Sequence, residues 1–280
     1  MAPTADPADA PVSVHAHLTF AVTMPSTIEL LIIPADSAGD RSDEQLVVTL
    51  DDAPLYADAV ANFPLEGTTA TVISTAPGHL TIDYTATVHR LEQAGGVTTD
   101  PVRDHLVGLR PGRYTPSDEL GGFAASMFGL VEPESTSRRI AEWVTAHTVY
   151  DSAASRPTGT GADTLHAGAG VCRDFAHLTA ALCRAVDIPS RVAAVYAPGL
   201  SPMDFHAVAE VLIGDRWFVL DATRLAPRQS LVRIATGRDA ADTAFANVSG
   251  MAELLDMEVT AVLGADELPL DDHTEAISLR

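Results

Sequence analysis

Residues 14–33 alternate between polar and apolar side chains with the period of two that is typical of β-strands. His15, His17 and Thr19 are each flanked by apolar residues, and an apolar run ends at Ile33. Further runs rich in Val, Ile, Thr and Tyr are bounded by Gly, Pro or Asp, namely residues 45–50, 70–74 and 80–88. Short strands at this spacing predict an antiparallel sandwich or barrel.

The period changes after a stretch of loop-forming residues between positions 95 and 116, where Gly and Pro recur. Ser117 can cap a helix over residues 118–130, and Ser135 or Ser137 can cap a second helix. Four residues of the second helix share one face at helical spacing, namely Ile140, Trp143, Val144 and His147. The pattern therefore predicts helices in the middle of the chain.

Strands return at Phe205, so the second half combines helices with a sheet and is of the α+β class. We predict a flexible tail at residues 1–12, an all-β, sandwich-like N-terminal domain at 13–112, and a core of helices packed on an antiparallel sheet at 113–280. The chain shows no internal repeat.

The composition is strongly acidic and lacks lysine. With 38 acidic and 17 basic residues, the formal net charge is -21. A negative field of this size repels phosphate backbones and anionic lipid head groups, so neither nucleic acid nor a membrane surface is expected as a partner. The oligomeric state is left open by the sequence.

Two cysteines, Cys172 and Cys183, are the only thiols in the sequence. If they share a helix, they lie roughly 16 Å apart, which is too far for a disulfide. The N-terminus has no basic segment followed by an apolar stretch, and no apolar run is long enough to span a bilayer. Free thiols without an export signal predict a cytoplasmic protein.

The most informative stretch places two glycines and a cysteine ahead of a helical pattern. Gly168 and Gly170 allow close backbone approach, and Cys172 then starts the helix. Unpaired N–H groups and the positive end of the helix dipole favour a thiolate at this position, and the same N–H groups can hold a developing oxyanion. Alone, such a cysteine is more often a small buried residue than a nucleophile.

A predicted hairpin supplies both a base and a carboxylate for this cysteine. His206 heads its first strand, the turn is Gly214-Asp215, and Asp221 ends its second strand. With an even loop, two residues share a face when their numbers sum to an odd value, as 206 and 221 do. We therefore predict that Asp221 orients the imidazole of His206, unless a bulge interrupts either strand.

These three segments resemble the core motifs of bacterial transglutaminase-like proteins, a family that includes transglutaminase-like cysteine proteases. The segments are Gly170–Leu178, Asp204–Val211 and Trp217–Thr223, with weaker resemblance at Ile188–Arg191 and Gly237–Asp239. The separations of 34 residues from Cys172 to His206 and 15 from His206 to Asp221 agree with that family. The resemblance implies a papain-like core, and the β-rich first hundred residues are similar to the family's N-terminal region.

By this resemblance Cys172 would be the nucleophile, His206 the general base and then acid, and Asp221 the orienting carboxylate, with no cofactor and no metal. Family members commonly carry an aromatic residue two positions after the histidine, whereas this sequence has Val208. We expect that difference to affect substrate preference more than the triad. The donor that completes the oxyanion hole in the family cannot be placed from the sequence.

The expected reaction is thiol-dependent acyl transfer on a peptide or protein amide. Water would resolve the thioester in a protease or amidase, and an amine acceptor would resolve it in a transglutaminase. The sequence does not choose between hydrolysis and transamidation. The alternative is a non-catalytic peptide-binding protein that retains the core and uses its β-rich domain for interactions.

The other thiol and imidazole groups are expected to have structural roles. His177 lies five residues after Cys172, about 140° around a helix, so it is a poor base for that sulfur. Cys183 falls mid-helix among apolar residues and is expected in the core. Together with His166, these residues lack the paired short spacing of a zinc site. Arg173 and Asp174 occupy the first helical turn, where a substrate-facing role stays open.

Overall fold

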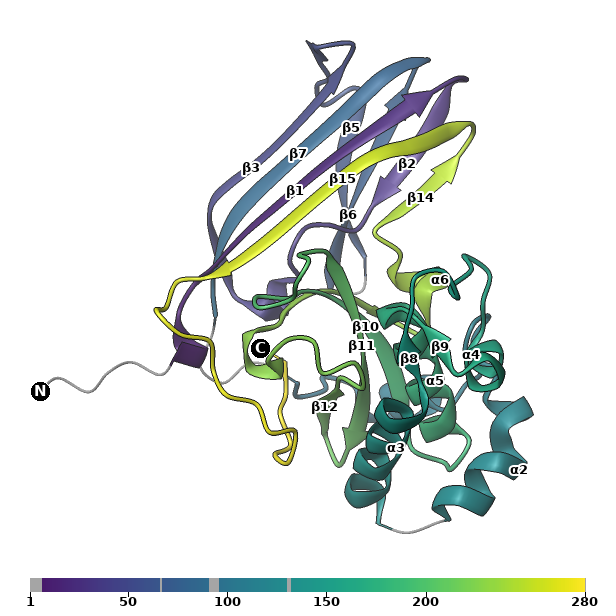
Figure 1. Ribbon diagram of the computed structural model, residues 1–280. Coiled ribbons are helices and arrows are strands. Elements are labelled where there is room, and N and C mark those ends of the chain that lie inside the picture. Colours follow the sequence, from purple (N-terminus) through teal and green to yellow (C-terminus); the bar gives the residue numbers. More distant parts are fainter. Residues whose placement is uncertain (1–6, 66, 91–95, 130–131, 280) are drawn as a thin grey trace, which may run out of the picture.

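Two β-sheets packed face to face form the first part of the computed structural model, which describes residues 7–65, 67–90, 96–129 and 132–279. One sheet has the strand order β15-β1-β7-β3-β4 and the other β14-β2-β6-β5 (Figure 1). The strands are β1 (Val12–Val22), β2 (Ser26–Leu30), β3 (Asp40–Leu50), β4 (Ala53–Pro54), β5 (Val60–Leu65), β6 (Thr68–Thr75), β7 (Gly78–His89), β14 (Ala246–Ser249) and β15 (Ala252–Leu263).

The core of this sandwich follows from the alternation in its strands. In β1 the inward-facing Val12, Val14 and Leu18 are buried, while the outward-facing His15 and His17 keep partial exposure. Apolar residues of both sheets form one cluster, which includes Ile28 of β2 and Ile73 of β6. The predicted β-rich N-terminal region is confirmed as a sandwich.

The sandwich is completed by strands from the far end of the chain. β15 pairs antiparallel with β1 over its whole length, from Val12 opposite Leu263 to Val22 opposite Ala252, and β14 pairs with β2. Without β15, β1 would present an open edge. The predicted division at residue 113 therefore misassigned residues 246–263, because a strand that returns to an earlier sheet carries no sequence signal of its partner.

The second part of the molecule is a four-stranded antiparallel sheet with helices against it (Figure 1). The sheet order is β12-β11-β10-β13, with β10 (Ser190–Tyr196), β11 (Phe205–Ile213), β12 (Arg216–Leu220) and β13 (Val232–Gly237). The helices are α2 (Ser117–Phe128), α3 (Pro133–His147), α4 (Gly161–Ala167), α5 (Cys172–Arg184) and the short α6 (Ala240–Thr243). The α+β class is thereby confirmed.

Helix boundaries differ from the sequence-based expectation in three places. An unpredicted helix, α1 (Pro101–Gly108), occupies part of the expected loop region; Asp100 caps it by accepting a hydrogen bond from the Arg103 N–H. α2 starts at Ser117 itself. α3 starts before Ser135, because the Glu132 carboxylate accepts from two backbone N–H groups and is the actual cap. Gly95 and Leu130 lie outside the described residues.

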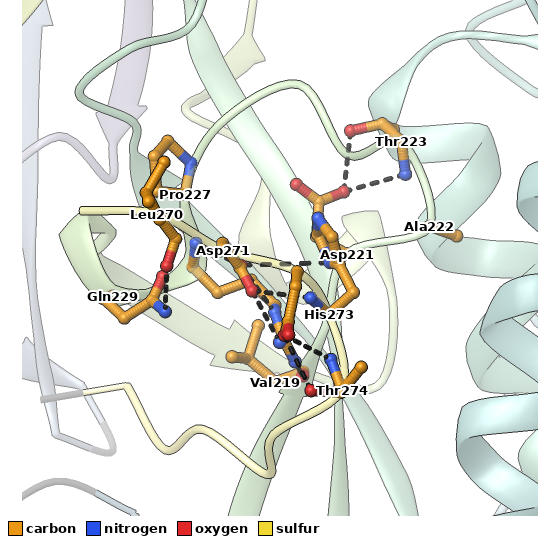
Figure 2. A network of polar contacts seen from close by, with 12 residues as sticks. Val219, Asp221, Ala222, Thr223, Pro227, Gln229, Leu270, Asp271, His273 and Thr274 are labelled. Atoms are coloured by element: carbon orange, nitrogen blue, oxygen red, sulfur yellow. Dashed lines mark hydrogen bonds and ion pairs between the residues drawn. The ribbon is translucent and has the colours of Figure 1, made fainter. Parts of the chain in front are cut away.

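The last residues of the chain connect the sandwich back to the second sheet. The backbone carbonyl of Ile277 accepts a hydrogen bond from the Val219 N–H along the edge of β12. Asp271 (Figure 2) forms a buried ion pair with Arg228 at 2.8 Å. Leu279 is 1% exposed. The C-terminal segment thus covers the outer edge of the strand that leads to Asp221. None of the described helices is long and apolar enough to cross a membrane.

Candidate active site

Cys172 is the first residue of α5, as the sequence predicts, and its side chain is partly exposed. The approach to this position depends on two glycines. Gly168 has φ +62°, and a Cβ on Gly170 would come within 2.6 Å of the Cβ of Asp174. The Asp174 carboxylate accepts a hydrogen bond from the Val171 N–H and closes the start of the helix.

Arg173 and Asp174 fix the loop that precedes the helix. Asp174 is 3% exposed and pairs with Arg173 at 3.0 Å. The Arg173 guanidinium also donates to the Ser155 hydroxyl and to the Arg156 carbonyl. Every described polar contact of these two side chains therefore serves to hold the backbone around Cys172.

The hairpin of β11 and β12 brings His206 and Asp221 together. Ala209 lies opposite Leu220, so the two functional residues share a face as close diagonal neighbours, which confirms the parity argument. Nε2 of His206 lies 2.9 Å from Oδ2 of Asp221, and each side chain is 1% exposed. No bulge interrupts the pairing of these strands.

Thr223 orients the Asp221 carboxylate, a role the sequence did not reveal. Its hydroxyl lies 2.7 Å and its backbone N–H 2.9 Å from Oδ1 of Asp221 (Figure 2). Both groups donate to the oxygen that does not face His206. The carboxylate is therefore held on both sides, which fixes the direction in which it presents Oδ2 to the imidazole.

His206 and Asp221 each stabilise the charged form of the other side chain. Burial alone lowers the pKa of His206, but the charge and hydrogen bond of Asp221, together with the Cys172 thiol, outweigh it and raise the pKa above the ordinary 6.5. Burial acts to raise the pKa of Asp221, yet His206 and Thr223 overcome it and lower the pKa. The geometry thus favours an imidazolium between a carboxylate and a sulfur.

The Cys172 thiol acts on His206 as a hydrogen-bonding partner and through its charge, and both effects raise the pKa of the imidazole. Since Asp221 occupies Nε2, the interaction of the thiol with His206 falls to Nδ1. Nδ1 is buried and has no hydrogen bond of ordinary geometry to any described residue. The sulfur is therefore the described group placed to exchange a proton with it, and the structure brings together all three residues that the sequence singled out.

Tyr150 is a further residue at this site that sequence reasoning missed. It belongs to β8 (Val149–Tyr150), which pairs with β9 (Ala169–Gly170), so Tyr150 lies opposite Gly170 and close to Cys172. Both the backbone N–H and the thiol of Cys172 act on its hydroxyl as hydrogen-bonding partners. Burial, followed by the charge of Cys172, raises the pKa of Tyr150 to about 12, so the hydroxyl keeps its proton.

Two positions discussed from the sequence have structural roles. Val208 is 1% exposed and packs with Val219 and Leu279, so this side chain is part of the core rather than an exposed wall. His177 is fully buried, and its Nε2 accepts a hydrogen bond from the Ala240 N–H. Burial is the largest effect on His177 and lowers its pKa to about 4, so it is neutral near pH 7.

Comparisons with known proteins identify the family of the chain. A family model, the transglutaminase-like superfamily, matches residues 123–222, which include Cys172, His206 and Asp221. The crystal structure of a "putative cysteine protease" from Cytophaga hutchinsonii is 34% identical, covers 96% of both chains and has a TM-score of 0.84. The chain belongs to the transglutaminase-like superfamily.

The likeness to the Cytophaga hutchinsonii structure extends through the sandwich as well as the core, because nearly the whole of each chain is covered. An uncharacterized protein of Mycobacterium leprae (strain TN) is 27% identical over 148 residues, which make up 49% of this chain. The match spans about half the length of that curated relative, 52%.

Proposed function

We propose that this protein is a thiol-dependent acyl-transfer enzyme that acts on peptide or isopeptide amides, with Cys172 as nucleophile, His206 as proton carrier and Asp221 as the carboxylate that orients it. The observation that carries the proposal is the His206 imidazole, which lies 2.9 Å from the Asp221 carboxylate and interacts with the thiol at the start of α5. This arrangement is that of a nucleophile, base and orienter.

In the first half-reaction the Cys172 sulfur bonds to the carbonyl carbon of the amide. The developing oxyanion would lie near the Cys172 N–H, where the Tyr150 hydroxyl can serve as a second donor. As the C–N bond breaks, the His206 imidazolium transfers its proton to the leaving amine. The products of this half-reaction are a free amine and a thioester on Cys172.

In the second half-reaction an acceptor attacks the thioester carbon and passes its proton to His206. The C–S bond then breaks, which restores the thiolate and the imidazolium. Water as acceptor gives a carboxylic acid, and a primary amine gives a new amide. The partners of this proposal are therefore a peptide or protein amide and, for transamidation, an amine. The two free thiols support a cytoplasmic location as part of the same proposal.

A peptide and amine library tests the proposal on the wild-type protein beside Cys172→Ala. Mass spectrometry would follow both products, a new carboxylate or a new amide bond. We expect turnover with wild type and with Cys183→Ala, the matched control, and none with Cys172→Ala. Binding of the same peptides by wild type and Cys172→Ala, with turnover by neither, would replace the enzyme with a peptide-binding protein.

A further inference from the structure

A large cavity lies at the opposite end of α5 from Cys172, where the sandwich meets the core. Its volume is about 520 Å³, within the usual range for small-molecule sites. Arg184, the last residue of α5, donates hydrogen bonds to the carbonyls of Ser190 and Arg238, which both line the cavity. Arg184 follows Cys172 by twelve residues, so the two ends of α5 lie about 18 Å apart. The cavity is therefore distinct from the proposed active site.

Arg191 lines this cavity. Its guanidinium group is held in place, but only part of its hydrogen-bonding capacity is used. Its Nε donates to Glu210 at 2.7 Å, and its guanidinium carbon lies 4.0 Å from the centre of the Trp217 ring. The two terminal nitrogens make no hydrogen bond to any residue within the described ranges, and the side chain keeps 20% exposure. The stacking on Trp217 and the Nε contact with Glu210 therefore fix the Arg191 guanidinium at the cavity wall. Its two terminal nitrogens stay available as a fork of N–H donors.

The charge behind this fork is only partly neutralised. Glu210 is fully buried, and its second oxygen accepts from Arg233 at 2.5 Å. One carboxylate is thus paired with two guanidinium groups, and Asp104 adds a weaker attraction on Arg191. Burial, the largest effect, lowers the pKa of Arg191 despite the attraction of Glu210. An anion bound at the fork would offset this desolvation.

The other charges of the cavity define which anion fits. Arg110 also lines it, is exposed, and has no ion-pair partner among the residues that the structure describes. Asp104 accepts hydrogen bonds from the Trp217 indole N–H and the Thr98 hydroxyl, and its charge attracts Arg191. Asp242 is paired with Arg238. Glu29, half-buried, lies on the sandwich side of the cavity without an ion pair in the described part of the chain. Its negative charge disfavours ligands that carry several negative charges.

We propose that this cavity binds a small carboxylate ligand, whose two oxygens are held by the terminal nitrogens of Arg191 with Arg110 as a second cationic contact. A planar carboxylate matches the two parallel N–H donors of a guanidinium. Glu29, which lines the same cavity, suits a ligand that also carries an ammonium group, as an amino acid or short peptide does. Nothing in this binding step requires the Cys172 chemistry.

Isothermal titration of the full chain with L-alanine and with acetate, which each carry a single carboxylate, beside inorganic phosphate, tests the proposal. We expect saturable 1:1 binding of at least one carboxylate, weakened at least about tenfold in Arg110→Gln and in Arg191→Lys, which keeps the charge but loses the fork. Arg113→Gln is the matched control, since Arg113 is exposed three positions from Arg110 and outside the cavity lining. Cys172→Ala should bind as wild type does, so the result stands apart from any test of catalysis.

Three outcomes would overturn the proposal. These are the absence of saturable carboxylate binding up to about 10 mM, phosphate binding as tight as that of both carboxylates, or unchanged affinity in Arg110→Gln. Because Arg191 contacts the buried Glu210, folding of each variant is verified by circular dichroism. Arg110 is exposed and makes no described ion pair, so Arg110→Gln remains decisive if Arg191→Lys fails to fold.

Discussion

Helix α5 carries one thiol and faces one imidazole at its start, and it carries a second thiol and imidazole in its buried body. Cys172 is partly exposed beside His206, whereas Cys183 is fully buried and burial raises its pKa to about 12. Burial raises the cost of a charge at both histidines, yet the pKa of His206 is raised and that of His177 is lowered. The difference lies in the partner: Asp221 touches His206, and a backbone N–H touches His177.

Burial therefore separates the two thiols, but it does not separate the two imidazoles, which are both buried. A carboxylate at 2.9 Å overcomes the desolvation of one imidazole, while the other imidazole must accept a hydrogen bond and so stays neutral.

The largest effect is expected from Asp221→Asn. The amide can still accept from Thr223 but carries no charge, so burial would then dominate at His206 and lower its pKa. We expect kcat for the proposed amide reaction to fall about 10⁴-fold, in line with the loss of an orienting carboxylate in comparable triads. Asp215→Asn in the β-turn is the control, and a loss below about tenfold would remove Asp221 from the mechanism.

Thiol labelling measures the contrast between the two cysteines directly. With iodoacetamide at about pH 6, we expect Cys172 in the Cys183→Ala protein to react at least about 100-fold faster than Cys183 in the Cys172→Ala protein. Exposure and the neighbouring imidazolium favour the first thiol, and complete burial blocks the second. His206→Ala should slow the labelling of Cys172; equal, slow rates for both thiols would contradict the assignment.

Tyr150→Phe tests the hydroxyl that adjoins the Cys172 N–H. The variant keeps the ring, which packs near Phe175, and removes only the donor. We expect kcat to fall about 100-fold with a smaller change in KM, because the contact is strongest with the oxyanion. An unchanged or increased kcat would instead mean that the hydroxyl blocks the N–H in the free enzyme.

The sequence carried enough information to predict the local parts of the site. Two glycines and a helical pattern placed Cys172 at a helix start, and residue parity placed His206 and Asp221 on one face of a hairpin. These inferences succeed because helix starts and tight hairpins are determined by nearby residues.

The long-range strand pairings could not be predicted from the sequence. β15 returns to β1 across more than two hundred residues, and Tyr150 reaches Cys172 only because β8 pairs with β9. The cavity at Arg191 likewise combines residues from both parts of the fold. An alternating pattern predicts a strand but not its neighbour, so the composition of the sandwich and the second donor at the site required coordinates.

His177→Gln gives the smallest effect and the sharpest test of the buried pair. The folded-state pKa of His177 is about 4, below the ordinary 6.5, so the neutral form is favoured in the folded protein. The resulting penalty is absent above about pH 6.5 and grows as the pH falls toward 4, because the unfolded chain then binds the proton first. His206 has the opposite sign, since the stability it contributes is present below 6.5 and is lost as the pH rises through its raised pKa.

Glutamine can accept from the Ala240 N–H as the imidazole does, but it cannot be protonated. Between about pH 7 and pH 5, we expect wild type to lose about 2 kcal/mol more unfolding free energy than His177→Gln, as measured by urea denaturation. Groups that titrate in both proteins cancel in this difference, and a general offset from weaker stacking on Tyr114 changes the level but not the slope. Equal slopes would mean that folding does not lower the pKa of His177, and the contrast between the two imidazoles would then disappear.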